Sequence, residues 1–275
     1  DYEIYMWVNF LTNPPMMVHD WGDWCGYKFL EALPLLRIAS GSDLNKQVDP
    51  VWKDVILKSI GPDGLFYISL DGRPWGKINS CWASVVYRAD GPTTVVADPT
   101  VTQLGHAYAC GRILSTITIY YLRDKNPVWK EIGERMIDRL TQIAIDKGDY
   151  CYFPDAAFEP NAKVPRDAPP PHAPHIAAES FGRLIQGRVQ FYRATGYKPA
   201  IVLARKIVNY MRCQSGYFAP DSSFPNEPLN GGKAHFHAHT MGLLGMLDCA
   251  LAQNDSELKA YVKKGFEWAK SNPAS

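Results

Sequence analysis

Apolar residues recur at steps of three and four over several stretches of the chain, which is the spacing of an amphipathic helix. Residues 127 to 148 and 256 to 271 show this spacing most clearly, because each has one apolar and one charged face. A less polar stretch of the same spacing precedes each of them. The pattern therefore predicts pairs of helices, which we expect at 24–40 with 50–60, 103–123 with 127–148, 177–195 with 199–212, and 239–253 with 256–271.

A short motif repeats near the start of the first helix in three of these pairs. It reads Gly-Arg-Ile-Leu from Gly111, Gly-Arg-Leu-Ile from Gly182 and Gly-Leu-Leu-Gly from Gly242. Intervals of roughly 60 to 70 residues are longer than two helices and short turns need, so each repeat must include an extended connection. We expect short β-hairpins at these connections, which are 64–71, 148–155 and 216–221.

Repeated helix pairs with long connections on one side predict an all-α fold, an α/α toroid in which inner helices are wrapped by outer ones. The less polar first helix of each pair suits the inner layer, and the second suits the solvent side. We expect one toroid domain over residues 1–275, with the β-hairpins at its mouth. Because the chain holds about four hairpins and a closed ring of this kind needs about six, we favour a fragment of a longer chain over a ring completed by other elements.

Charge and composition narrow the range of partners. The chain has 29 Lys and Arg against 28 Asp and Glu, a net charge of +1, so it lacks the basic surplus that binds nucleic acids or anionic membrane surfaces. No stretch approaches the ~20 consecutive apolar residues of a membrane span. We expect a soluble protein with no nucleic-acid or membrane partner, secreted or periplasmic rather than cytoplasmic.

The cysteines give no sign of a metal site or a disulfide scaffold. All six are scattered, and no Cys-x-x-Cys pair occurs. Cys110, Cys213 and Cys249 fall within apolar helical patterns. These three are predicted to be buried as small hydrophobic residues.

The histidines are the strongest functional signal in the sequence. Every one of them lies just before or at the start of a predicted inner helix. Imidazole forms hydrogen bonds through both ring nitrogens and titrates near neutrality, so histidines concentrated on one rim indicate a polar ligand site. The seven are His19, His106, His172, His175, His235, His237 and His239.

The segment from His19 to Trp24 combines acids with indole rings. Asp20 and Asp23 are three residues apart and share a face if the segment is helical. The rings of Trp21 and Trp24 suit the apolar faces of sugars, and a carboxyl between them would have a raised pKa, as a general acid requires. We therefore assign Asp23 to catalysis and its neighbours to sugar binding. The alternative is that these acids cap the first helix, a role that stays open for Asp20 in particular.

A second group, His175, Glu179 and Arg183, has the four-residue spacing that places all three on one helical face. If this face points inward, Arg183 would keep Glu179 ionised, which fits Glu179 as a base or nucleophile opposite a protonated Asp23. The alternative is an ordinary ion pair on a helix surface. A basic side chain could also receive a substrate carboxylate, as a uronic acid would require, and the candidates are Arg112, Arg183 and Lys233.

The run His235, His237 and His239 has three possible roles. In an extended segment the three rings share a side, which would allow metal binding, but on a helix only His235 and His239 do. Because no fourth ligand is evident in the sequence, we predict no metal and no cofactor. Binding of sugar hydroxyls and packing at the helix start remain, and we favour sugar binding.

At these residues the chain resembles the six-hairpin glycosidases of the (α/α)6 toroid class. The likeness is carried by residues 19–26, 178–187 and 235–247, and covers most of the chain from about residue 14. These motifs are similar to those of bacterial enzymes that degrade polysaccharides. The resemblance implies hydrolysis of a glycosidic bond by paired carboxylates at the toroid mouth.

The branches of that group differ in their fit. The β-L-arabinofuranosidase branch uses a glutamate and three cysteines around zinc, whereas this sequence has no adjacent cysteine pair and no Glu-x-Cys. Branches that act on uronic acids, the β-glucuronidases and unsaturated uronyl hydrolases, are compatible with the arginines. Two other functions stay open, a toroid that binds glycans or proteins without catalysis, and a polysaccharide lyase with a His or Tyr base.

Overall fold

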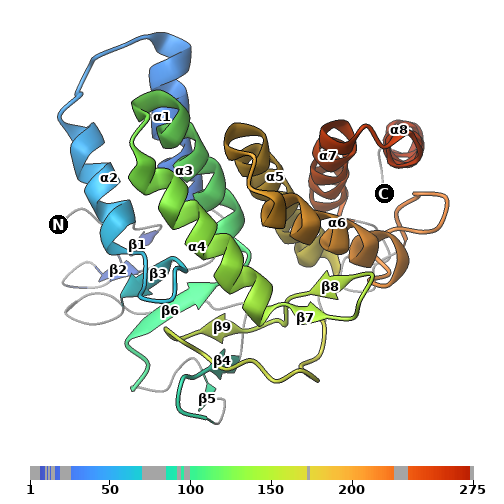
Figure 1. Ribbon diagram of the computed structural model, residues 1–275, viewed down its shortest axis with the longest axis horizontal. Helices are drawn as coiled ribbons and strands as arrows, with labels where there is room; N and C mark the ends of the chain where they lie inside the picture. The colour runs from blue at the N-terminus through green and yellow to red at the C-terminus, as the bar shows by residue number, and fades with distance from the viewer. Residues whose placement is uncertain are drawn as a thin grey trace. The chain divides into compact units, whose positions relative to one another are not determined.

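The computed structural model describes residues 7–9, 11, 13, 16–18, 26–69, 85–91, 94–95, 100–171, 174–225 and 235–272. This part of the chain is mostly helical, as an all-α fold requires. Figure 1 shows its helices, which are α1 (Gly26–Ser40), α2 (Val48–Lys58), α3 (Ala109–Asp124), α4 (Pro127–Ile143), α5 (Pro174–Thr195), α6 (Lys198–Cys213), α7 (Phe236–Gln253) and α8 (Ser256–Ser271). Its strands are short and comprise β1 (Trp7–Asn9), β2 (Met16–Val18), β3 (Tyr67–Ser69), β4 (Val85–Tyr87), β5 (Thr94–Val95), β6 (Gln103–His106), β7 (Ile145–Asp146), β8 (Cys151–Tyr152) and β9 (Ala157–Phe158).

The four helix pairs predicted from the sequence are confirmed, as α1 with α2, α3 with α4, α5 with α6, and α7 with α8. Two helix ends were predicted wrongly. Residues 103–106 form strand β6, so α3 begins only at Ala109, and α4 ends at Ile143, before strand β7. Of the predicted β-hairpins, β7 and β8 form the one expected near 148–155. The other two predictions were wrong, because strand β3 within 64–71 pairs with the distant strand β6, and 216–221 forms bends and a turn.

The chain divides into two compact units. Unit 1 comprises Asp1–Leu140 and Asp155–Pro165, and unit 2 comprises Thr141–Pro154 and Arg166–Ser275. Each unit is described by itself below. A single toroid domain over residues 1–275 therefore stays a prediction.

In unit 1, helix α1 packs against α2 and α3, and α3 is buried along most of its length. A five-stranded sheet has the order β3-β6-β9-β4-β5, with β4 parallel to β9 and the other neighbours antiparallel. Gly105 of β6 lies opposite both Tyr67 and Phe158. A Cβ atom at Gly105 would lie 2.8 Å from the Tyr67 ring, so this register depends on glycine.

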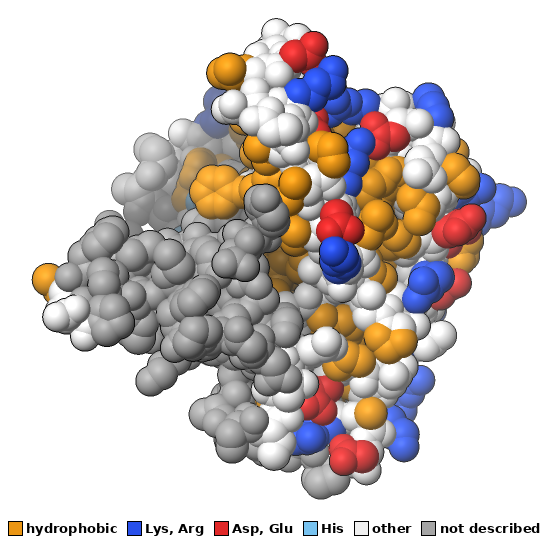
Figure 2. Space-filling view, turned by 90° about the vertical axis from the view of Figure 1, so that its left-hand side faces the viewer, with side chains coloured by type: hydrophobic (Ala, Val, Ile, Leu, Met, Phe, Trp, Pro, Cys, Tyr) orange, Lys and Arg blue, Asp and Glu red, His pale blue; other side chains and the backbone are white. Residues whose placement is uncertain are grey.

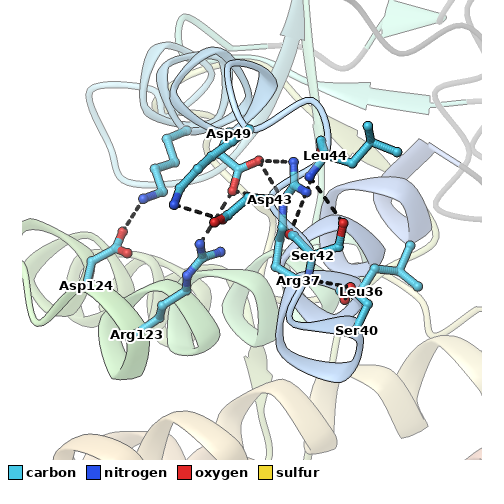
Figure 3. Close-up of polar contacts among 11 residues, drawn as sticks. Leu36, Arg37, Ser40, Ser42, Asp43, Leu44, Asp49, Arg123 and Asp124 are labelled. Carbon is cyan, nitrogen blue, oxygen red and sulfur yellow. Dashed lines mark hydrogen bonds and ion pairs between the residues drawn. The ribbon is translucent and has the colours of Figure 1, made fainter.

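A buried carboxylate joins α1, α2 and α3 of unit 1 (Figure 3). Asp49, in the first turn of α2, accepts hydrogen bonds from Nε and Nη2 of Arg37 on α1, at 3.0 and 2.9 Å. Its second oxygen lies 3.5 Å from Nη2 of Arg123, in the last turn of α3. Arg37 also donates to the carbonyl oxygens of Ser42 and Leu44, which fixes the connection between α1 and α2. Because the planar arginine fork matches a carboxylate, Asp49 has a structural role here.

In unit 2, helices α5 and α7 cross at glycines. A Cβ atom at Gly182 of α5 would overlap the carbonyl oxygen of Met241 on α7, and one at Gly245 would overlap the carbonyl oxygen of Gly182. The backbones are therefore in direct contact, which only residues without a side chain permit. Two glycines of the repeated motif, Gly182 and Gly245, thus lie where the backbones of α5 and α7 touch.

The second helices of the pairs cover this contact in unit 2. Helix α6 packs against α5 and strand β8, and α8 packs against α7. A cluster of aromatic rings lies beneath α6, where Tyr210 contacts Tyr152, Phe181 and Tyr217 with ring centres 5.3 to 6.0 Å apart. Burial raises the pKa of Tyr210 to about 12, so its hydroxyl stays protonated.

The surface of the described residues carries charges of both signs. On the face shown in Figure 2, Lys and Arg side chains are interspersed with Asp and Glu, and hydrophobic side chains reach the surface between them. In the described part of the chain, no helix is long and apolar enough to cross a membrane.

Candidate functional site

Glu179 and His237 meet in unit 2 and form the core of the candidate site. Oε2 of Glu179 lies 3.5 Å from Nδ1 of His237, near the starts of α5 and α7. The glutamate side chain is 4% exposed and the histidine side chain is 59% exposed. A buried carboxylate therefore has an imidazole beside it that a ligand in solution can reach. Such a pair can hold or transfer a proton.

The local sequence explains why these two side chains meet. Gly182 lies three residues after Glu179, and Met241 lies four residues after His237, so the backbone contact at Gly182 is one turn away from the pair. His235 begins α7, where its Nδ1 accepts a hydrogen bond from the backbone N–H of Ala238 at 3.3 Å. This hydrogen bond fixes the start of α7, and His237 faces Glu179 two residues later.

A chain of hydrogen bonds continues along α5 toward α7. Nη1 of Arg183 donates to Oε1 of Gln186 at 2.9 Å, and Nε2 of Gln186 donates to Oδ2 of Asp248 at 3.1 Å. Nη2 of Arg183 lies 3.7 Å from the sulfur of Met241. The sequence predicts that Arg183 acts on Glu179. The structure adds that Arg183 is connected to α7, directly through Met241 and indirectly through Gln186 and Asp248.

No family model and no curated protein matches this sequence.

His239 lies in an aromatic cluster. Its ring is fully buried, stacks on Phe224 at 4.7 Å and meets Phe218 edge to face. Its Nδ1 is 2.9 Å from the carbonyl oxygen of His235. These surroundings give His239 a packing role at the start of α7, and direct sugar binding by His239 stays a prediction. His235 itself is partly exposed and caps the helix, with its ring centre 6.1 Å from that of His237.

His106 and Arg112 lie in unit 1. His106 is the last residue of β6, is buried, and has its ring centre 4.7 Å from that of Tyr108. Arg112, in the first turn of α3, forms an ion pair with Glu31 of α1 at 3.2 Å. Arg112 therefore has a carboxylate partner from the protein itself, which gives it a structural role in holding α1 on α3.

The other predicted site residues cannot be placed. His19, Asp20, Trp21, Asp23 and Trp24 lie outside the described residues, as do His172 and Lys233. His175 lies in the first turn of α5, and its side chain is outside the described part. Among the residues that the structure describes, no three His, Cys, Asp or Glu side chains are placed to hold a metal ion.

Sequence reasoning missed two members of the polar network and one partner of a predicted residue. Gln186 follows Arg183 by three residues, a spacing that could have pointed to it. Asp248 lies 62 residues beyond Gln186 and Glu31 lies 81 residues before Arg112, so both contacts depend on tertiary structure. No local signal marks either residue.

Proposed function

We propose that the protein is a glycoside hydrolase that cleaves the glycosidic bond of a saccharide, with Glu179 as one of two carboxylates. The observation that carries this proposal is the contact between the buried Glu179 carboxylate and the exposed imidazole of His237. Glycosidases need one carboxylate as nucleophile or base and a second as acid, and Asp23 is our candidate for the second. His237 would bind a sugar hydroxyl beside Glu179.

The proposed architecture is an α/α toroid with the site at its mouth. Two features support it, namely the four consecutive helix pairs and the position of the histidines. His175 lies in the first turn of α5, His235 caps α7, and His237 and His239 lie in its first turn, so these four histidines lie at the starts of first helices, as the toroid proposal requires.

The substrate class that we favour is an acidic saccharide. Arg183 lies one helical turn after Glu179, and its guanidinium is planar and permanently charged. A guanidinium recognises a carboxylate with two parallel hydrogen bonds, which suits a uronic acid.

The proposal is tested by incubating the chain with a panel of aryl glycosides and aryl uronides and measuring release of the aryl group. We expect turnover by the wild type, and a loss of about 10²-fold or more in Glu179→Gln, because the amide can neither accept a proton nor act as a nucleophile. The matched control is Glu131→Gln, which changes an exposed glutamate of α4 and should keep wild-type activity.

Two results would contradict hydrolysis, and a third would contradict the role of Glu179. An unsaturated product that absorbs in the near ultraviolet would indicate a lyase. Saccharide binding without any release would indicate a binding protein without catalysis. Equal activity in wild type and Glu179→Gln would show that Glu179 is not a catalytic residue.

A further inference from the structure

The side chain of Gln186 is buried between α5 and α7 and uses both ends of its amide. Its oxygen accepts from Arg183 and its nitrogen donates to Asp248. The orientation of this amide is determined by its neighbours, because a guanidinium can only donate and a carboxylate can only accept. The reversed amide would lose both hydrogen bonds.

We propose that Gln186 and Asp248 are positioning residues that hold the Arg183 guanidinium so that it receives the carboxylate of an acidic sugar. This inference rests on the function proposed above for the same site. Neither residue is assigned to the site by the sequence, and neither is expected to touch the substrate. Asp248 acts through Gln186, and Gln186 acts through Arg183.

The chemistry explains why such a connection is needed. An arginine side chain has many rotamers, and ordering it costs conformational entropy. A guanidinium that is already held at Nη1 by Gln186 has lost part of this freedom before the ligand arrives. The backbone carbonyl oxygen of Asp248 accepts a hydrogen bond from Nη2 of Arg193 on α5 at 3.4 Å, so α5 contacts this residue at its backbone as well as at its carboxylate.

The glycine contact makes this connection possible. With the backbones of α5 and α7 touching at Gly182, a side chain as short as glutamine reaches from one helix to a carboxylate on the other. Glu179 with His237 and Arg183 with Gln186 and Asp248 then form two polar links between the same two helices.

The test measures binding of D-glucuronate and D-glucose to the whole chain by chemical-shift titration, which does not depend on turnover. We expect the wild type to bind glucuronate at least tenfold more tightly than glucose. Gln186→Leu keeps a similar volume and removes both hydrogen bonds, so it should abolish most of this preference. Asp248→Leu should do the same, whereas Asp248→Asn retains an acceptor oxygen and should keep most of the preference.

Each outcome decides the inference. Equal binding of the two sugars by the wild type would overturn it, as would an unchanged preference in both leucine variants. If Gln186→Leu does not fold, Asp248→Leu serves alone, because Asp248 is only partly buried and its loss leaves α5 intact. One further combination separates the two proposals. If the wild type prefers glucuronate and the leucine variants lose that preference, the positioning role stands even when no glycoside is cleaved. The lack of cleavage would then contradict only the proposed hydrolysis.

Discussion

At the scale of single residues, the cysteines differ in their access to solvent. Cys110, Cys151 and Cys249 are buried, and Cys213, the last residue of α6, is exposed. Burial raises the pKa of the Cys151 and Cys249 thiols to about 12. Since the thiolate is the reactive form, both thiols should be inert in the folded protein.

This difference predicts the outcome of labelling with iodoacetamide at pH 8, followed by mass spectrometry of each site. Cys213 should be modified in the native state, whereas Cys110, Cys151 and Cys249 should be modified only after unfolding in denaturant. Modification of Cys151 or Cys249 at the rate of Cys213 would contradict the burial of these thiols. The labelling also tests Cys213 itself, which the apolar pattern had placed in the core.

The sequence predicted some of the site residues and could not predict others, for physical reasons. Glu179 and His237 were both singled out, from a helical spacing and from clustered histidines, but their contact joins two helices and no local pattern encodes it. The prediction that Cys213 is buried was wrong because a periodic pattern does not register that a helix end is open to solvent.

At the scale of elements, the glycines at the crossing of α5 and α7 differ in whether a larger residue could replace them. A Cβ at Gly182 would meet backbone atoms of Met241 and Gly242, which cannot move without shifting the helix. A Cβ at Gly242 would meet the ends of the Met211 and Phe218 side chains, at 3.0 and 3.1 Å, and its nearest printed backbone atom, the carbonyl oxygen of Ala178, would lie 3.3 Å away. Side-chain ends can adjust, and alanine also favours the helix by up to ~1 kcal/mol over glycine.

We therefore expect Gly182→Ala to lower the free energy of unfolding by about 1 to 3 kcal/mol and Gly242→Ala to change it by less than about 1 kcal/mol. Urea denaturation of the two variants and the wild type measures the difference. Equal losses in both variants would show that the helices do not touch at Gly182.

An ion pair joins the β7–β8 hairpin to α6 in unit 2. Nζ of Lys206 lies 2.6 Å from Oδ2 of Asp146. Burial alone would raise the pKa of Asp146, but the hydrogen bonds from Lys206 and from the backbone N–H of Gly148, with the charge of Lys206, lower it below the ordinary value of 3.8. A carboxyl with a lowered pKa in the folded state stabilises the fold above its unfolded pKa, and this stabilisation is lost as the pH falls through the folded pKa.

Lys206→Met should therefore lower the free energy of unfolding at pH 7, by no more than about 0.2 to 1 kcal/mol because the Asp146 side chain is half exposed. The difference between variant and wild type should shrink as the pH is lowered below 3.8. Urea denaturation at pH 7 and pH 3 is the measurement. A difference that stays constant or grows at pH 3 would contradict the assignment.

The helices were predictable from the sequence and the five-stranded sheet was not. Helical periodicity repeats over several turns, as in α4 and α6, and the pattern is read within the element itself. The strands are two to four residues long. Strand β4 pairs in parallel with β9, although both α3 and α4 lie between these strands in the sequence. Strands that pair at such a sequence separation leave no periodic pattern in the local sequence. The residues of β6 were therefore predicted to be the start of a helix.

At the scale of the whole molecule, the central claim is that acids far apart in the chain converge at one site. Within unit 2, the helix pairs α5 with α6 and α7 with α8, and the histidines at the starts of α5 and α7, are the observations behind this proposal.

The most direct test is a crystal structure of the whole chain in which the separation of the Asp23 and Glu179 carboxyl carbons is measured. The claim predicts a separation of about 5 to 10 Å around a shared cavity, the range in which paired carboxylates cleave glycosidic bonds. Asp23 and Glu179 on different surfaces, with no cavity in common, would contradict it.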